Sequence, residues 1–207
     1  MKTTSTIKNK QILFITATNT DVGKSYACSV LLKKYAKEGL KVGYFKPIET
    51  GVTSVPHDGT LLLNLTQTLN ASFNVTINDV VPYQFELPAS PFVAKQQSHI
   101  DIALIKEKMN YLLQFCDILI IEGAGGLMVP ILKEYFMIDL IQELNAKAIL
   151  IVPSHLGSIN DTLLSMEALK NRNIEFDWYV NLYKDKEEFS RITLPFYEAY
   201  FGKIKYL

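Results

Sequence analysis

The sequence predicts an α/β fold in which helices cover both faces of a mostly parallel sheet. Three short segments are apolar throughout, Ile12–Ile15, Ile118–Ile121 and Ala148–Val152, and longer segments with helical periodicity separate them. Such runs are typical of parallel strands, because these strands are buried on both faces. The 207 residues are 48% hydrophobic and 20% charged, with no repeat, low-complexity tract or linker. We therefore predict a single domain over residues 1–207.

Apolar spacing and terminating residues define the elements of the first half. They are a strand over Ile12–Ile15, a helix over Ser25–Lys37, a strand over Val42–Phe45, and a helix that begins at Asp58 and runs through Leu65. We expect a loop from Thr16, Gly39 as the C-cap of the first helix, and Asp58 as the N-cap of the second. Lys46-Pro47 ends the second strand.

The second half continues the alternation of helices and strands. Its predicted elements are a helix after Ser90-Pro91, a helix opened by Asp101 and running through Leu112, a strand over Ile118–Ile121, a helix over Met137–Leu144, a strand over Ala148–Val152, a helix over Ser158–Lys170 and a last strand over Phe176–Leu182. Ligands of such sheets bind at the carboxyl ends of the strands. The unusual residues of this chain follow predicted strand ends, at 16–25, 46–58, 122–126 and Asn181.

Charge and apolar run length limit the classes of partner. Lys plus Arg and Asp plus Glu both number 21, so the formal net charge is zero. A neutral chain has no overall field for nucleic acid or an anionic membrane, and we expect neither partner. Residues 1–10 are a candidate disordered segment without a signal-peptide-length apolar stretch, and the longest apolar runs are too short to span a membrane. We predict a soluble, cytoplasmic protein.

The two cysteines, Cys28 and Cys116, give no sign of a disulfide framework or a metal site. They are too few for the first and lack the spacing of the second. We expect both to be buried as small hydrophobic residues.

The segment TATNTDVGKS, Thr16–Ser25, has the features of a nucleotide-binding loop. Such a loop needs backbone N–H groups around the phosphates, a lysine at their outer oxygens and a hydroxyl for magnesium. Gly23, Lys24 and Ser25 supply these in order at the start of a helix, whose dipole favours anions. Thr18 stands where the usual pattern has glycine, so a chance Gly-Lys-Ser at a helix start is the alternative.

Glu122 follows a buried strand and precedes a predicted glycine loop, Gly123–Gly126. A carboxylate at a strand end beside a phosphate loop is placed to interact with magnesium. The glycines allow a ligand to approach the backbone closely. The alternative is a solvated strand terminus.

Lys46 lies in the segment YFKPIETG, Tyr44–Gly51, at the end of the strand that follows the first helix. Lys24 and Lys46 facing one site would repel each other unless a polyanion lay between them. The pair therefore predicts a cleft for a nucleotide and an acidic substrate. Taken alone, Lys46 also fits an exposed strand-end lysine.

Together these motifs resemble the dethiobiotin synthetase family of biotin biosynthesis. The matching segments, in order from about Ile12 to Asn181, are TNTDVGKS (18–25), YFKPIETG (44–51), PYQFELPASP (82–91), EGAGG (122–126) and HLGSIN (155–160). The resemblance implies a P-loop NTPase fold and an ATP- and magnesium-dependent ring closure. In that reaction carbon dioxide adds to one amine of 7,8-diaminononanoate, the carbamate is phosphorylated, and the second amine attacks the mixed anhydride. The products are dethiobiotin, ADP and phosphate.

The resemblance also implies roles for individual residues. Lys46 and Lys24 are the implied catalytic residues, and Ser25, Asp58 and Glu122 the implied magnesium ligands. The implied nucleotide contacts are Thr20, Asp21, Val22, Gly23, Lys24, Ser25, Tyr26, Glu122, Gly123, Ala124, Gly125 and Asn181. The implied substrate contacts are Thr20, Thr50, Gly157, Ser158, Ile159 and Asn160. The resemblance implies that Gly157–Asn160 receive the substrate carboxylate across a homodimer interface.

The chain departs from the family pattern at several points. Ala17 replaces a usual glycine and Asp21 a usual glutamate. Asn181 stands at an adenine-contacting position, but the Pro-x-Leu-Gly-x-Ile-Pro stretch that usually follows is missing. We therefore predict weaker discrimination among nucleoside triphosphates.

Two other classes of protein share parts of the pattern. A partition or septum-placement ATPase, a regulatory switch, usually has a further lysine where this chain has Asn19, and lacks the Lys-Pro-x-x-Thr strand end. An amidotransferase-like ligase normally has a glutaminase domain, for which 207 residues leave no room. We predict the ring-closing ligase and keep the partition-type ATPase as the alternative.

Overall fold

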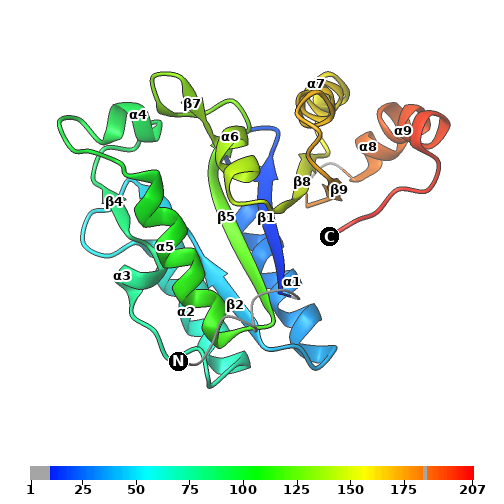
Figure 1. Cartoon of the computed structure of the whole chain (residues 1–207). Coiled ribbons are helices and arrows are strands. Elements are labelled where there is room, and N and C mark those ends of the chain that lie inside the picture. The colour runs from blue at the N-terminus through cyan, green and yellow to red at the C-terminus, as the bar shows by residue number, and fades with distance from the viewer. Residues whose placement is uncertain (1–9, 184–185) are drawn as a thin grey trace.

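Five parallel strands form the central sheet of the computed structural model, which describes residues 10–183 and 186–207 (Figure 1). Across the sheet they lie in the order β2 (Val42–Phe45), β5 (Ile118–Gly126), β1 (Gln11–Ala17), β8 (Lys147–Pro153) and β9 (Phe176–Asn181). All neighbouring pairs are parallel, so the five carboxyl ends lie at one edge of the sheet. This confirms the predicted fold class. Apart from Lys10, the candidate disordered segment lies outside the described residues.

Helices cover both faces of the sheet. In the view of Figure 1, α5 and α6 lie in front of the strands and α1 lies behind them. The longer helices are α1 (Lys24–Lys37), α2 (His57–Leu69), α5 (Ile102–Leu112), α6 (Met137–Glu143) and α7 (Ser158–Asn171). Except for α2, their bounds agree with the predicted ones to within one residue.

The core lies between these layers and contains the middle strands. Phe14, Ile15, Ile120, Ile121 and Leu150 are completely buried. Burial of both strand faces explains why these segments are apolar throughout rather than alternating. Cys28 and Cys116 are also buried, as predicted.

Several short elements were not among the predicted ones. They are β3 (Ile48–Thr50) and β4 (Tyr83–Phe85), which pair in parallel, β6 (Pro130–Leu132) and β7 (Tyr135–Phe136), which pair antiparallel, the helices α3 (Ile77–Val80), α8 (Lys186–Ile192) and α9 (Leu194–Phe201), and the 3-10 turn η1 (Leu113–Phe115). The helix expected after Ser90-Pro91 is present as the single turn α4 (Pro91–Ala94). Asp101 caps α5 as predicted, since its side chain accepts a hydrogen bond from the Ala103 N–H.

Two local predictions were wrong. The segment Gly123–Gly126 is not a loop but the end of β5, with Gly126 in register with Ala17 of β1. The two backbone segments approach so closely there that a Cβ on Gly126 would lie 2.9 Å from the Thr18 carbonyl oxygen. Asp58 is not an N-cap either, because α2 begins at His57 and Pro56 precedes it.

The C-terminal helices α8 and α9 lie beyond the edge strand β9 (Figure 1). Trp178 of β9 packs against Tyr197 and Phe201 of α9, with ring centroids 5.5 and 4.8 Å away. No helix among the described residues is long and apolar enough to cross a membrane.

Candidate active site

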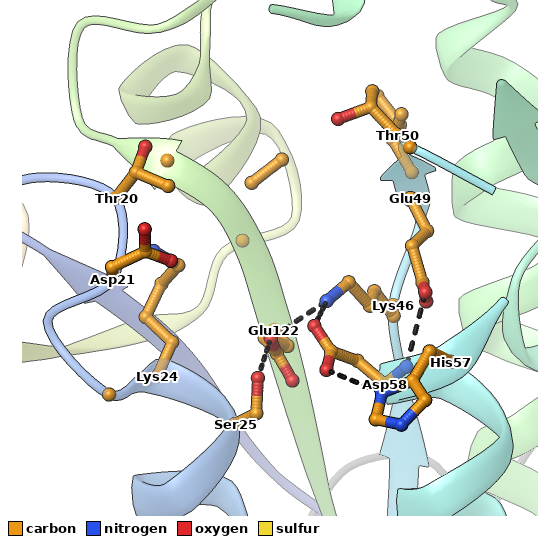
Figure 2. A pocket seen from close by; sticks show the side chains of 16 residues that line it. Thr20, Asp21, Lys24, Ser25, Lys46, Glu49, Thr50, His57, Asp58 and Glu122 are labelled. Carbon is orange, nitrogen blue, oxygen red and sulfur yellow. Dashed lines mark hydrogen bonds and ion pairs between the residues drawn. The ribbon is translucent and has the colours of Figure 1, made fainter. Parts of the chain in front are cut away.

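One cavity of about 540 Å³ lies at the carboxyl ends of β1, β2 and β5 (Figure 2). Lys24 and Ser25 stand on one side, Lys46 and Asp58 on the other, and Glu122 between them. The predicted site residues that line it are Thr20, Asp21, Gly23, Lys24, Ser25, Lys46, Thr50, Asp58, Glu122, Gly123, Ala124 and Gly125. The two lysines therefore face one cavity, as the sequence predicted.

The loop before α1 is shaped to present backbone N–H groups. Gly23 has φ +98°, and a Cβ on it would lie 2.2 Å from the side-chain nitrogen Nδ2 of Asn181, so glycine is required there. Asp21 also adopts a left-handed conformation, with φ +59°. The Lys24 ammonium reaches back to the Asn19 carbonyl at 3.3 Å. Since α1 begins at Lys24, its first N–H groups are available to an anion.

Lys46 is the buried cation of the site. Its Nζ lies 2.7 Å from Asp58 Oδ2 and 2.8 Å from Glu122 Oε1, and the residue is only 5% exposed. The reading of Lys46 as an exposed strand-end lysine is therefore excluded. Burial alone would lower the pKa of Lys46, but Glu122 and Asp58 outweigh it and raise that pKa above the ordinary value.

Glu122 accepts hydrogen bonds from three residues, one on α1, one on β2 and one just after β2. Oε1 accepts from Ser25 Oγ and Lys46 Nζ, each at 2.8 Å, and Oε2 accepts from Tyr44 Oη at 2.8 Å. The residue is 1% exposed, so it is not a solvated strand terminus. Burial, together with the charge of Glu122, raises the pKa of Tyr44 well above its ordinary value, so this hydroxyl stays a donor.

Glu49 was missed by the sequence analysis although it lies between two predicted site residues. It is buried, lines the cavity, and accepts the N–H groups of Asp58 at 3.1 Å and Gly59 at 2.9 Å. A carboxylate from β3 thus caps α2, and this leaves the Asp58 side chain to Lys46. The signal available in the sequence was an acidic residue inside YFKPIETG. Burial raises the pKa of Glu49, whereas the attraction of Lys46 outweighs burial and lowers the pKa of Asp58.

The pKa of Lys24 is shifted in the opposite direction to the pKa of Lys46. Burial lowers its pKa below the ordinary value, and the charge of Lys46 lowers it further, although Glu122 opposes both. The ammonium of Lys24 is therefore costly to bury by itself, and a bound anion would stabilise it.

The oxygen donors at the cavity fit a magnesium ion that is shared with phosphate groups. Ser25 Oγ, Asp58 and Glu122 are hard oxygen ligands, which Mg²⁺ prefers, and Ser25 and Glu122 are already in contact. The described residues contain no group of three or more His, Cys, Asp or Glu side chains that could hold a metal ion. The donor set therefore fits the way in which Mg²⁺ binds nucleotides, through one or two carboxylates and phosphate oxygens.

A second cavity of about 330 Å³ adjoins the loop on the side of β9. Asp21, Gly23, Tyr26 and Asn181 line it together with Leu182, Tyr183 and Leu207. Asn181 is buried and donates a hydrogen bond to the Val22 carbonyl at 2.8 Å. The structure thus brings Val22, Tyr26 and Asn181 together near the loop but outside the cavity of the lysines.

The predicted carboxylate-binding segment, Gly157–Asn160, lines neither cavity. It forms the start of α7, with Gly157 at φ +93° as the N-cap residue. Gly157 and Asn160 are exposed, Ile159 is half-buried and Ser158 is buried. Within one chain these residues are not brought to the lysines.

The chain matches a family model and, over most of its length, named relatives of known sequence. A family model described as an AAA domain matches residues 11–177. The chain is 53% identical to the ATP-dependent dethiobiotin synthetase of Sulfurovum sp. (strain NBC37-1), covering 91% of this chain and 90% of that protein. It is 40% identical to that of Wolinella succinogenes, with 90% and 88% covered.

Solved structures with the same fold are more distant in sequence. The MinC:MinD cell division protein complex of Aquifex aeolicus gives a TM-score of 0.57 at 18% identity, over 94% of this chain and 79% of that one. A plasmid partition protein from Borrelia burgdorferi gives 0.58 at 15% identity, over 97% and 89%. Identities this low establish a common fold and leave the activity to the site and to the closer relatives.

Proposed function

Because the chain belongs to the family of ATP-dependent dethiobiotin synthetases, we propose that it closes the ring of dethiobiotin from 7,8-diaminononanoate, carbon dioxide and ATP. The observation that carries the proposal is the arrangement of Lys24 and Lys46 on opposite sides of Glu122 in one cavity (Figure 2). Two cations facing one cavity, whose described lining includes no cysteine, suit charge stabilisation of phosphoryl transfer.

The reaction begins with carbamate formation. One amine nitrogen of the substrate attacks carbon dioxide and releases a proton, and the Lys46 ammonium then stabilises the carbamate anion. Thr20 and Thr50 line the same cavity and supply hydroxyl groups to the carbamate and the diamine. In the unliganded site the same ammonium is held by Asp58 and Glu122.

Phosphoryl transfer and ring closure follow. A carbamate oxygen attacks the γ-phosphorus as the bond to the ADP oxygen breaks. Lys24 and Lys46 stabilise the charge on the transferring group from two sides. The second amine then attacks the carbamoyl carbon, the bond to phosphate breaks, and the attacking nitrogen loses a proton to phosphate or water, which leaves the cyclic urea.

The nucleotide site is proposed to combine both cavities. Asp21, Gly23, Ala124 and Gly125, which line the large cavity, present backbone to the phosphates, and Val22 belongs to the same loop between Asp21 and Gly23. The cavity beside Tyr26 and Asn181 takes the base. When bound, magnesium would neutralise phosphate charge. Ser25, Asp58 and Glu122 are the residues that would hold it.

We propose a homodimer for the substrate carboxylate. Gly157–Asn160 lies away from the lysines within one chain, so a second copy would have to bring the start of its α7 to the cavity. A helix N-terminus is suited to a carboxylate because its N–H groups and dipole favour anions.

We also propose that residues 1–207 act as one domain in the cytoplasm, with no nucleic-acid or membrane partner.

The test is the dependence of phosphate release on the diamine. Purified protein with Mg²⁺, ATP, bicarbonate and diaminononanoate should release one phosphate per dethiobiotin detected by mass spectrometry. Without the diamine, phosphate release should fall to background. Hydrolysis that ignores the diamine but rises with DNA or lipid vesicles would instead favour the partition-type ATPase.

A further inference from the structure

The hydroxyl of Tyr44 is a buried polar group that donates to Glu122, and neither the sequence motifs nor the proposed chemistry gives it a role. Tyr44 is completely buried on β2, and Glu122 is 1% exposed on β5. The Tyr44 Oη donates to Glu122 Oε2 at 2.8 Å. Tyr44 is not among the residues that line the large cavity, so it does not itself touch a ligand there.

The sheet register explains how the two side chains meet. Tyr44 lies opposite Ile120 in the parallel pair of β2 and β5. Glu122 is two residues beyond Ile120, and Lys46 two residues beyond Tyr44. Because side chains alternate along a strand, Tyr44, Ile120 and Glu122 share one face of the sheet, and Lys46 follows directly after the end of β2. The hydroxyl therefore comes from a rigid strand rather than from a loop.

The two oxygens of Glu122 have different partners. Oε1 contacts Ser25 and Lys46, which line the cavity, whereas Oε2 contacts Tyr44, which does not. The carboxylate cannot rotate about its last bond without breaking the bond to Tyr44. The plane of the carboxylate is thereby fixed, with one oxygen toward the cavity and the other held by Tyr44 away from Lys46.

We propose that Tyr44 is a positioning residue, whose hydroxyl fixes the Glu122 carboxylate so that Oε1 faces the metal–nucleotide site. The proposal rests on the proposed function in that Glu122 serves magnesium there. Outer hydrogen bonds to ligating carboxylates orient them, and their loss typically weakens metal binding about 10- to 100-fold.

The direct test is Tyr44→Phe, which removes only the hydroxyl. Mn²⁺ is titrated calorimetrically into protein saturated with ADP, with no diamine present, so the outcome does not depend on whether ring closure occurs. We expect the dissociation constant for Mn²⁺ to rise about tenfold or more. In turnover, the Mg²⁺ concentration for half-maximal rate should rise, while the KM for the diamine stays within twofold.

The matched control is Tyr135→Phe. Tyr135 Oη is buried and has no hydrogen-bond partner in the described part of the chain, and Tyr135 is outside the large cavity. This variant should leave Mn²⁺ binding unchanged. An unchanged Mn²⁺ dissociation constant in Tyr44→Phe would overturn the proposal, even if the melting temperature fell, because a merely structural hydroxyl affects stability alone.

Two further measurements test the proposal, and the second, which keeps the tyrosine, applies even if Tyr44→Phe folds poorly. In the Glu122→Gln background, Tyr44→Phe should weaken Mn²⁺ binding by less than twofold more, and an equal effect in both backgrounds would contradict action through Glu122. In otherwise native protein, 3-fluorotyrosine at position 44 should give a fluorine resonance that shifts when Mg²⁺ joins the ADP complex. The same label at position 135 should not shift, and an unmoved resonance at position 44 would also contradict the proposal.

Discussion

Lys46 Nζ lies 2.8 Å from Glu122 Oε1 in a pair that is almost completely buried, with the two residues 5% and 1% exposed. A buried charge that loses its partner is strongly destabilising, whereas an apolar replacement of both partners is much less so. The free energy of unfolding of the protein therefore depends on two residues of its candidate site.

The first prediction concerns Lys46→Met, which leaves Glu122 buried without its cation. We expect a loss of roughly 3 kcal/mol in the free energy of unfolding, measured with urea. The double variant Lys46→Met with Glu122→Gln should recover part of that loss, because the uncompensated charge is gone. Equal stability of the single variant and the native chain would show that the pair contributes nothing.

The second prediction concerns Lys24→Met. Burial lowers the pKa of Lys24, so its charge is held at a cost until an anion binds. The unliganded variant should therefore melt no lower than the native protein. Its ATP dissociation constant, from isothermal titration, should rise at least about tenfold, the equivalent of about 1.4 kcal/mol.

Lys33→Met is the control for this variant, since Lys33 is exposed on the same helix. It should change neither the melting temperature nor ATP binding by a measurable amount. Unaltered ATP affinity in Lys24→Met would remove Lys24 from the phosphate site.

The third prediction concerns acid. Lys46 holds the pKa of Asp58 below its ordinary value although burial opposes this, so Asp58 binds protons more readily in the unfolded chain. Its contribution to stability is complete above the unfolded value of about 3.9 and is lost as the pH falls through the lower folded value.

Asp58→Asn should therefore flatten the acid side of a stability profile measured by thermal melting between about pH 5 and pH 2. Glu107→Gln, which changes an exposed carboxylate on α5, should leave the profile as it is. Parallel profiles for Asp58→Asn and the native chain would contradict the coupling of Asp58 to Lys46.

The fourth prediction concerns the base. The cavity beside Asn181 is also lined by Leu182, Tyr183 and Leu207, and Tyr26 in the same lining is 55% exposed. We expect the apparent affinities for ATP, GTP and CTP to lie within about tenfold of one another, or about 1.4 kcal/mol. Competition against a fluorescent ATP analogue measures this, and a strong preference for ATP would contradict it.

The loop and helix around Lys24 could be predicted from sequence because their signals are local. An apolar strand, Gly23-Lys24-Ser25 and a helical apolar pattern are adjacent in the chain, and the structure places them as expected. The convergence of Lys24 and Lys46 could also be predicted, since parallel strands bring their carboxyl ends to one edge.

The remaining features depend on contacts between distant segments. Glycines are poor strand formers, yet Gly123 lies in β5, which pairs with β1, and a Cβ on it would lie 2.7 Å from the Phe14 ring, so only glycine fits. Aspartate often caps the N-terminus of a helix, but here the Glu49 carboxylate accepts the first N–H groups of α2. The Asp58 side chain instead accepts a hydrogen bond from Lys46. The short helices α8 and α9 are stabilised by burial of Phe189 and Tyr197, which local propensity does not reveal.

The central claim is that Lys24 and Lys46 bind one polyanion from opposite sides. A crystal structure with Mg²⁺, a non-hydrolysable ATP analogue and the diamine carbamate tests it most directly. We predict that both ammonium groups lie within hydrogen-bond distance of the γ-phosphate or the carbamate, with Lys46 released from at least one of its two carboxylates. A complex in which Lys46 keeps both carboxylates while the γ-phosphate lies beyond its reach would contradict the claim.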